Sequence, residues 1–217
     1  MNLASSLFPL LCWIFYAFLV DRIDRFRPSL SALMNLQRCR WVSNAVHRDT
    51  PLDAILSSNL MSSVSFFAST TVLLVLALFT VFGQLPALIE ALVSIRPDLS
   101  SSDIQLQLIV MLVTFVMAFL AFTLALRQFN HFCIMLGAAD HTEQSNQEEI
   151  VAIAALNSLG ARNFNQGIRA YYFSIAMLAW FVSPLAAIGT TLVIVLFLIH
   201  REYFSYARTI VAKLKSP

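Results

Sequence analysis

Long stretches without charge alternate with short polar segments along this chain. Four stretches contain no Asp, Glu, Lys or Arg, and they cover residues 1–20, 54–89, 104–126 and 170–199. A bilayer core about 30 Å thick requires roughly 20 apolar residues of helix, and each stretch supplies them. The pattern predicts an all-α integral membrane helix bundle with four transmembrane helices at about residues 3–20, 57–82, 104–126 and 170–199.

The polar segments predict further helices. From Leu30, apolar residues alternate with arginines at helical spacing, which is typical of an amphipathic helix. It fits either the membrane interface, with Trp41 at headgroup level, or the protein's own cytoplasmic face. Thr50-Pro51-Leu52-Asp53 predicts the start of the second long helix and Gly83 its end, and residues 85–95 form a short apolar piece.

Helix signals later in the chain do not decide whether the fourth span is one straight helix. Ser145-x-x-Glu148 is a capping box that predicts a short helix ended by Gly160. The fourth stretch is longer than a straight span needs, so it either projects from the bilayer or bends at Ser183-Pro184.

Orientation follows from the positions of Lys and Arg. With four spans, the first and third loops share a side and hold nine basic residues, against five in the second loop and the tail. This favours both termini outside, although the basic tail conflicts with it. A re-entrant hairpin at Ser183-Pro184 would bring the tail inside and remove the conflict.

Composition agrees with a membrane protein of one domain, residues 1–217. The chain is 59% hydrophobic and 12% charged, with a mean hydropathy of +0.75. Three scattered cysteines suggest no disulfide framework, and a net charge of +2 gives no reason to expect a nucleic-acid partner.

Small residues form stripes on three predicted spans. The second span has serines at i, i+4, i+7 and i+11, and Asn59 lies at their mouth. Such stripes let helices approach closely in lipid, and hydroxyl groups also line permeation paths. Pore lining and helix packing both remain open for Ser58, Asn59, Ser62, Ser65 and Ser69.

The sequence offers few candidates for catalytic, proton-carrying or metal-binding residues. No span carries an ionisable residue near its centre, which argues against proton-coupled transport. No Walker, G-x-S-x-G, H-E-x-x-H or C-x-x-C motif is present, so we expect no enzyme, cofactor or metal site. His131, Cys133 and the segment Asp140-His141-Thr142-Glu143 form a weak metal candidate, more typical of a solvated loop.

A second group of candidates lies at the membrane boundary. Residues 162–173 combine two arginines and two asparagines with a pair of tyrosines, directly before the fourth span. Arginines there contact lipid phosphates or pair within the bundle. The candidate lipid or anion contacts are Arg40, Trp41, Arg162, Arg169, Tyr171 and Tyr172.

Several short motifs resemble a family of small membrane proteins of unknown function found in bacteria and plants. The similar segments are Arg40-Trp41-Val42, Asn59-Leu60-Met61, Gly167-x-Arg169-x-Tyr171-Tyr172-Phe173 before Trp180 and Pro184, and His200-Arg201-Glu202-Tyr203-Phe204. The resemblance covers residues 3–206. It implies four spans and no established activity. Ser58 stands where the family pattern often has arginine.

Two functions remain as hypotheses for a bacterial inner-membrane protein. The first is a self-associating, homo-oligomeric passive channel lined by the serine stripe. The second is a structural or accessory protein that binds anionic lipid or a protein partner.

Overall fold

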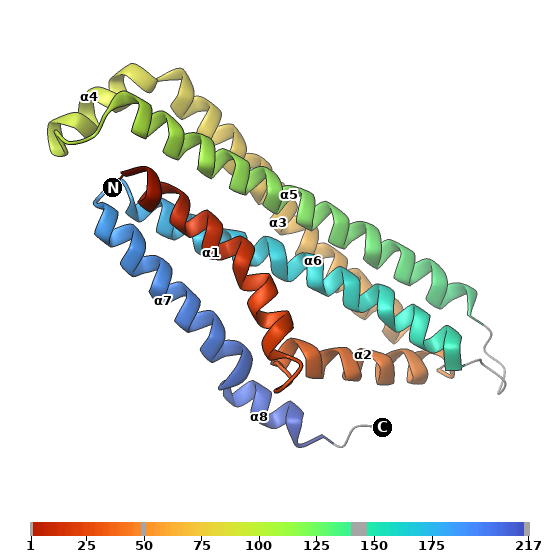
Figure 1. The fold of residues 1–217 in the computed structure, drawn as a ribbon. Coiled ribbons are helices and arrows are strands. Elements are labelled where there is room, and N and C mark those ends of the chain that lie inside the picture. The colour runs from red at the N-terminus through yellow and green to blue at the C-terminus, as the bar shows by residue number, and fades with distance from the viewer. Residues whose placement is uncertain (1, 49–50, 140–146, 215–217) are drawn as a thin grey trace. The chain divides into compact units, whose positions relative to one another are not determined.

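The computed structural model describes residues 2–48, 51–139 and 147–214, and every regular element in these ranges is a helix. The all-α prediction is therefore confirmed for this part of the chain. In chain order the helices are α1 (Asn2–Ile23), α2 (Leu30–Val46), α3 (Leu52–Gly83), α4 (Leu85–Ile95), α5 (Ser101–Ala138), α6 (Gln147–Ala179), α7 (Pro184–Tyr203) and α8 (Tyr206–Ala212) (Figure 1).

Three described segments are long and apolar enough to cross a membrane, namely Leu52–Gly83, Ser101–Ala138 and Pro184–Ala212. Ala4–Val20 and Leu85–Ile95 are shorter apolar helices. Four spans therefore stay a prediction.

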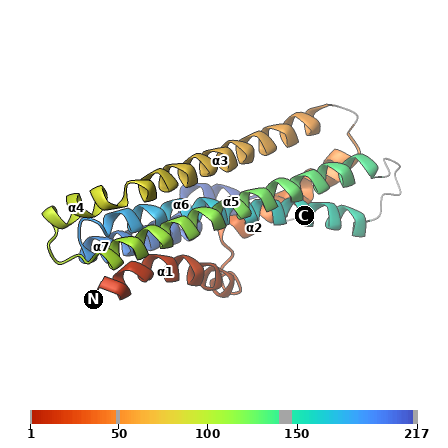
Figure 2. The same ribbon diagram turned by 90° about the horizontal axis from the view of Figure 1, so that it is seen from above.

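Local capping explains several helix starts. The hydroxyl of Ser29 accepts from the amide of Ala32 at 3.1 Å, which caps the amphipathic helix predicted from Leu30. At the start of α5, the carboxylate of Asp103 accepts from the amide of Ser100 at 3.3 Å, and Ser100 Oγ accepts from the amide of Asp103. The short apolar piece at residues 85–95 is a helix, α4, which follows α3 directly (Figure 2).

The helix predicted to end at Gly160 is wrong, because α6 continues through Gly160 to Ala179. Gly160 is instead a point of close approach in which a Cβ atom would lie 2.8 Å from Cε1 of Phe129. Thr50 and Ser145, the predicted caps of α3 and α6, lie outside the described residues.

The chain divides into two compact units. Unit 1 comprises Met1–Leu19, Ala68–Leu120 and Gln166–Leu198, and unit 2 comprises Val20–Phe67, Ala121–Asn165 and Ile199–Pro217. The single domain predicted for residues 1–217 stays a prediction.

Unit 1 shows that residues 170–199 are not one helix. α6 ends at Ala179, a turn follows, and α7 begins at Pro184, where a proline suits the first helical position. The Tyr172 ring of α6 contacts the Phe197 ring of α7 with centroids 5.8 Å apart. Because Phe197 lies near the end of the unit 1 part of α7, this contact requires α7 to run back along α6.

The core of unit 1 packs residues from α3, α5, α6 and α7 around Trp180. Trp180 and Met177 are fully buried, and Ile104, Phe115 and Leu78 belong to the same cluster. Unit 1 is thus a packed set of helical segments, into which the α6–α7 turn inserts its largest side chain.

Unit 2 has its own core. Val42 and Val46 of α2 pack with Phe132 of α5 and with Ile150 and Ile153 of α6. A second cluster brings together three rings from different helices, with centroids 5.6–5.7 Å apart. They are Phe67, Phe122 and Phe164.

Candidate functional site

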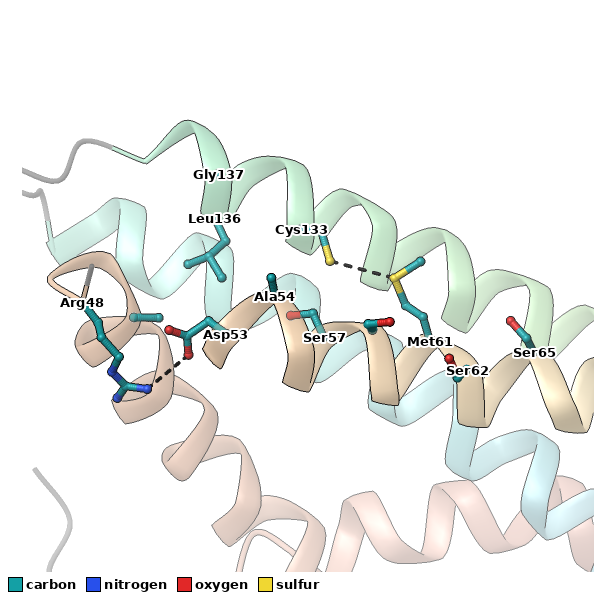
Figure 3. A pocket seen from close by; sticks show the side chains of 12 residues that line it. Arg48, Asp53, Ala54, Ser57, Met61, Ser62, Ser65, Cys133, Leu136 and Gly137 are labelled. Carbon is teal, nitrogen blue, oxygen red and sulfur yellow. Dashed lines mark hydrogen bonds and ion pairs between the residues drawn. The ribbon is translucent and has the colours of Figure 1, made fainter. Parts of the chain in front are cut away.

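An open pocket of about 820 Å³ lies in unit 2. We call it the serine pocket, because Ser57, Ser58, Ser62 and Ser65 of α3 line it (Figure 3). Its other lining residues are Ala45, Arg48, Asp53, Ala54, Met61, Cys133, Leu136 and Gly137. The volume falls within the range of about 300–1,000 Å³ that is typical of small-molecule sites.

The charged end of the serine pocket is formed by Arg48 and Asp53. Arg48 Nη1 lies 3.4 Å from Asp53 Oδ1, and the Trp41 indole donates to the same oxygen at 2.6 Å. Asp53 is buried, at 7% exposure. Because two donors share this carboxylate, its charge is compensated within the pocket.

The serine wall combines one buried hydroxyl with three exposed ones. Ser57 is only 6% exposed, it lines the pocket, and it has no hydrogen-bond partner among the described residues. Ser58, Ser62 and Ser65 are exposed and line the pocket beside it. The structure thus brings three residues of the predicted stripe to one cavity, together with a serine that the stripe did not include.

The remaining stripe residues lie elsewhere. Asn59 and Ser69 are exposed and do not line the serine pocket. The carbonyl of Asn59 accepts from the Ser63 hydroxyl at 2.9 Å, which is an ordinary bond within one helix. Pore lining by these residues stays a prediction.

The wall opposite the serines is apolar and contains sulfur. Cys133 of α5 lies 3.9 Å from the sulfur of Met61 on α3, next to Leu136 and Gly137 (Figure 3). Within the described ranges, no three His, Cys, Asp or Glu side chains gather as a metal site. Asp140, His141 and Glu143 of the weak metal candidate lie outside those ranges.

The predicted lipid contacts separate into exposed and packed residues. Arg40 and Arg162 are exposed and have no hydrogen bond or ion pair within the described part of the chain. Trp41, by contrast, is half-buried, and its ring lies 5.4 Å from that of Phe132.

The candidates next to the fourth stretch face other helices of unit 1. The guanidinium of Arg169 lies over the Tyr16 ring at 4.9 Å, and the hydroxyl of Tyr171 lies 2.6 Å from that of Thr71. Tyr172 contacts Phe197, as described above. Lipid contact by Arg169, Tyr171 and Tyr172 stays a prediction.

A buried polar network holds the α6–α7 turn in unit 1. Gln107 of α5 donates to the Met177 carbonyl at 2.6 Å and accepts from Ser6 of α1 at 2.5 Å. The Trp180 indole donates to Ser5 at 3.1 Å, and Arg96 donates to the Trp180 carbonyl at 2.8 Å. The guanidinium also lies over the Trp180 ring at 5.6 Å.

This network brings the start of α1, the start of α5, the loop after α4 and the α6–α7 turn to one end of unit 1. A family model described as a protein of unknown function, DUF599, matches residues 4–207. The chain belongs to the DUF599 family. No curated protein and no solved structure matches it.

In this DUF599 chain, the closing segment packs on the start of α2. The Glu202 carboxylate accepts from the amide of Ser31 at 3.2 Å and from its hydroxyl at 3.0 Å. The Tyr203 hydroxyl donates to Asp24 at 2.8 Å, and Arg27 donates to the Tyr203 carbonyl at 3.1 Å. A carboxylate at a helix N-terminus is favoured by the helix dipole, so these contacts fix the segment.

The structural roles of two other residues of the DUF599 chain could not be predicted from the sequence. Arg38 alternates with apolar residues like Arg40, yet its Nε donates to the buried Asn157 at 2.9 Å. Burial lowers the pKa of the Arg38 guanidinium below its ordinary value. The burial of Ser57 was equally hidden, because it depends on packing within unit 2 rather than on the pattern of α3.

Proposed function

We propose that this DUF599 chain is an integral membrane protein without catalytic activity, whose unit 1 crosses the bilayer in five passes. We further propose that unit 2 binds anionic lipid at the basic side. The proposal amends the predicted four spans by replacing the last one with two passes, the unit 1 parts of α6 and α7.

The reversal at the α6–α7 turn is the observation that carries this proposal. The turn lies at the end of unit 1 that also holds Ser5 and Arg96. The unit 1 segments range from about 21 Å for residues 166–179 to about 30 Å for residues 101–120, at about 1.5 Å per residue. Residues 101–120 match a hydrocarbon core of about 30 Å, and residues 166–179 reach this length only with about six further residues of α6.

Charge supports the same topology. With five passes, Arg96 is on one side and the other thirteen Lys and Arg residues are on the opposite side or at its boundary. Basic residues mark the cytoplasmic side, so the N-terminus is outside and the C-terminus inside. The conflict between the basic loops and the basic tail disappears. A bacterial inner membrane is the location we propose.

The outer surface of unit 1 also favours lipid. Large apolar side chains are exposed on several of its helices, including Phe15 and Phe18 of α1, Leu73 of α3 and Leu185 of α7, at 63–71% exposure. A water-soluble protein rarely exposes such contiguous apolar surface.

Lipid binding is tested by retention of phosphatidylglycerol in native mass spectrometry. Replacing Arg40 and Arg162 with glutamine removes two exposed charges, each worth about 1 kcal/mol near an anionic surface. We expect less phosphatidylglycerol and unchanged phosphatidylcholine. Arg169→Gln is the matched control, because its guanidinium lies over Tyr16. Equal phosphatidylglycerol retention in the double variant contradicts the proposal.

A passive permeation element is the second candidate. It is favoured by the exposed serines Ser58, Ser62, Ser65 and Ser69 of α3, because exposed small residues on a membrane helix permit close packing of a second copy. Native mass spectrometry should then detect a defined homo-oligomer, and Ser62→Val with Ser65→Val should change flux in liposomes. A monomer with no flux excludes this candidate.

A further inference from the structure

We propose that the serine pocket binds a single-chain amphiphile with an uncharged, hydroxyl-bearing headgroup. The inference goes beyond lipid binding at exposed arginines, and it rests on the proposed membrane location only for the source of the ligand. Three observations carry it, namely a buried serine side chain that faces the pocket, a compensated charge pair, and an apolar wall.

Ser57 is the observation that points to a ligand. Its side chain is more than nine-tenths buried, it faces the pocket, and it has no partner in the described chain. Its Oγ is not one of the polar atoms that are closed off from water without a partner, so a ligand hydroxyl would take the place of pocket water there. A serine hydroxyl both donates and accepts, so it can pair with a hydroxyl headgroup in either direction.

Arg48 and Asp53 select against a charged headgroup. Asp53 already accepts from Trp41 and lies 3.4 Å from Arg48, so the pair is neutral as a whole. An anion beside Arg48 would meet the carboxylate of Asp53, and a cation beside Asp53 would meet the guanidinium. A neutral headgroup meets neither repulsion.

The length of the pocket indicates the chain of the amphiphile. Asp53 is the last charged residue before the charge-free stretch 54–89, and the pocket extends along α3 from there to Ser65. Met61, Cys133 and Leu136 supply its apolar surface. The headgroup therefore lies at the Asp53 end, and the alkyl chain lies along the sulfur-containing wall.

The test titrates purified protein with monooleoylglycerol and counts the bound molecules by native mass spectrometry. An amine-oxide detergent is kept at one concentration throughout, so that its alkyl chain and accepting headgroup compete equally against both ligands. We expect one monooleoylglycerol per chain, bound more tightly than oleate, which has the same acyl chain and an anionic headgroup. No binding of monooleoylglycerol, or tighter binding of oleate, overturns the proposal.

Two variants assign the binding to this pocket. Ser57→Ala should weaken monooleoylglycerol binding about fivefold, which is the loss expected for one hydrogen bond. Gly137→Leu should abolish binding, because an added side chain there meets no atom within 4 Å and projects into open space at the pocket wall. Unchanged affinity in both variants overturns the proposal.

Two matched controls separate pocket effects from general ones. Ser63→Ala changes an exposed serine of α3 that bonds its own helix and does not line the pocket. Gly189→Leu changes an equally open glycine of α7, far from the pocket in sequence and in the other unit. Both should bind like the wild type. If Gly137→Leu does not fold, Ser57→Ala against Ser63→Ala decides the outcome.

The readouts also separate this inference from the proposed function. Phosphatidylglycerol retention depends on Arg40 and Arg162, neither of which lines the pocket. A negative result in the monooleoylglycerol titration therefore does not contradict the proposed function. A negative result for phosphatidylglycerol retention likewise does not contradict ligand binding in the serine pocket.

Discussion

Unit 1 and unit 2 differ most in where their charged residues lie. Unit 1 contains Arg96, Arg169, Glu90, Asp98 and Asp103 as its charged residues, whereas the other twelve basic and nine acidic residues belong to unit 2. Unit 1 thus carries a net charge of −1 and unit 2 a net charge of +3. A boundary defined by packing coincides closely with one defined by charge, as expected if the units meet different solvents.

The two units are alike in how they use buried polar groups. In unit 1, Gln107 and Thr71 bond to groups on other helices, and the Trp13 indole nitrogen is buried without a partner among the described residues. In unit 2, Arg38 donates to the Asn157 side-chain oxygen, and the Asn157 amide nitrogen is buried without such a partner. In each unit, therefore, a buried donor is left for water or a ligand.

The largest effect should come from the centre of unit 1. Trp180 is fully buried and anchors the α6–α7 turn, so Trp180→Ala should destabilise the protein by about 3–5 kcal/mol. Chemical denaturation in mixed micelles measures the loss. A loss below about 1 kcal/mol would show that the turn is not a structural centre of unit 1.

A substitution at the close contact between Gly160 and Phe129 in unit 2 should give the next largest loss of stability. Gly160→Ala places a Cβ atom 2.8 Å from the buried Phe129 ring, and such overpacking costs about 1–3 kcal/mol. Gly189→Ala in unit 1 is the control, because no atom lies within 4 Å of its added Cβ. The control should be neutral or slightly stabilising, since alanine favours helix. Equal melting temperatures for the two variants would contradict the close approach.

A smaller effect should isolate one hydrogen bond of unit 1. Trp180 and Trp13 are both buried, but the Trp180 indole donates to Ser5, whereas the Trp13 indole nitrogen has no partner among the described residues. Trp180→Phe should therefore cost roughly 0.6–1.7 kcal/mol more than Trp13→Phe, the range for a hydrogen bond between membrane helices. The two unfolding free energies, measured side by side, give the difference. Equal losses would argue against a role for the bond.

The smallest effect should depend on pH. Arg96 donates to the Asp98 carboxylate at 2.7 Å, and this bond holds the pKa of Asp98 below its ordinary value. A lowered folded-state pKa adds stability above the unfolded pKa of about 3.9, and the gain is lost as the pH falls through the folded value.

The Asp98→Asn variant should therefore have a slightly lower melting temperature than the wild type at pH 6. This difference in melting temperature should disappear as the pH falls. The side chain of Asp98 is largely exposed, so we expect a small shift. A gap that widens in acid would contradict this sign.

Much of the helical framework could be predicted, because charge and capping act locally. The charge-free stretches located α3 and α5, and the amphipathic spacing from Leu30 located α2. Gly160 could not be interpreted correctly, because a glycine at a helix end and a glycine under an aromatic ring look alike until Phe129 is placed.

The candidate site was only partly accessible from sequence. Spacing along α3 grouped Ser58, Ser62 and Ser65, but not Ser57, whose burial depends on packing against other parts of unit 2. The reversal after Ala179 was an open alternative at Ser183-Pro184. Hydropathy cannot decide it, because a bend and a hairpin have the same composition.

The most direct test of the five-pass topology compares the sidedness of Ile95 and Tyr206. Both are highly exposed, at 76% and 80%. Each is replaced by cysteine in a chain whose own cysteines are alanine, and intact cells are treated with a membrane-impermeant maleimide. Five passes predict that the cysteine at 95 is labelled in intact cells and the cysteine at 206 only after permeabilisation. Labelling of both on the same side would contradict the account and restore the four-span topology.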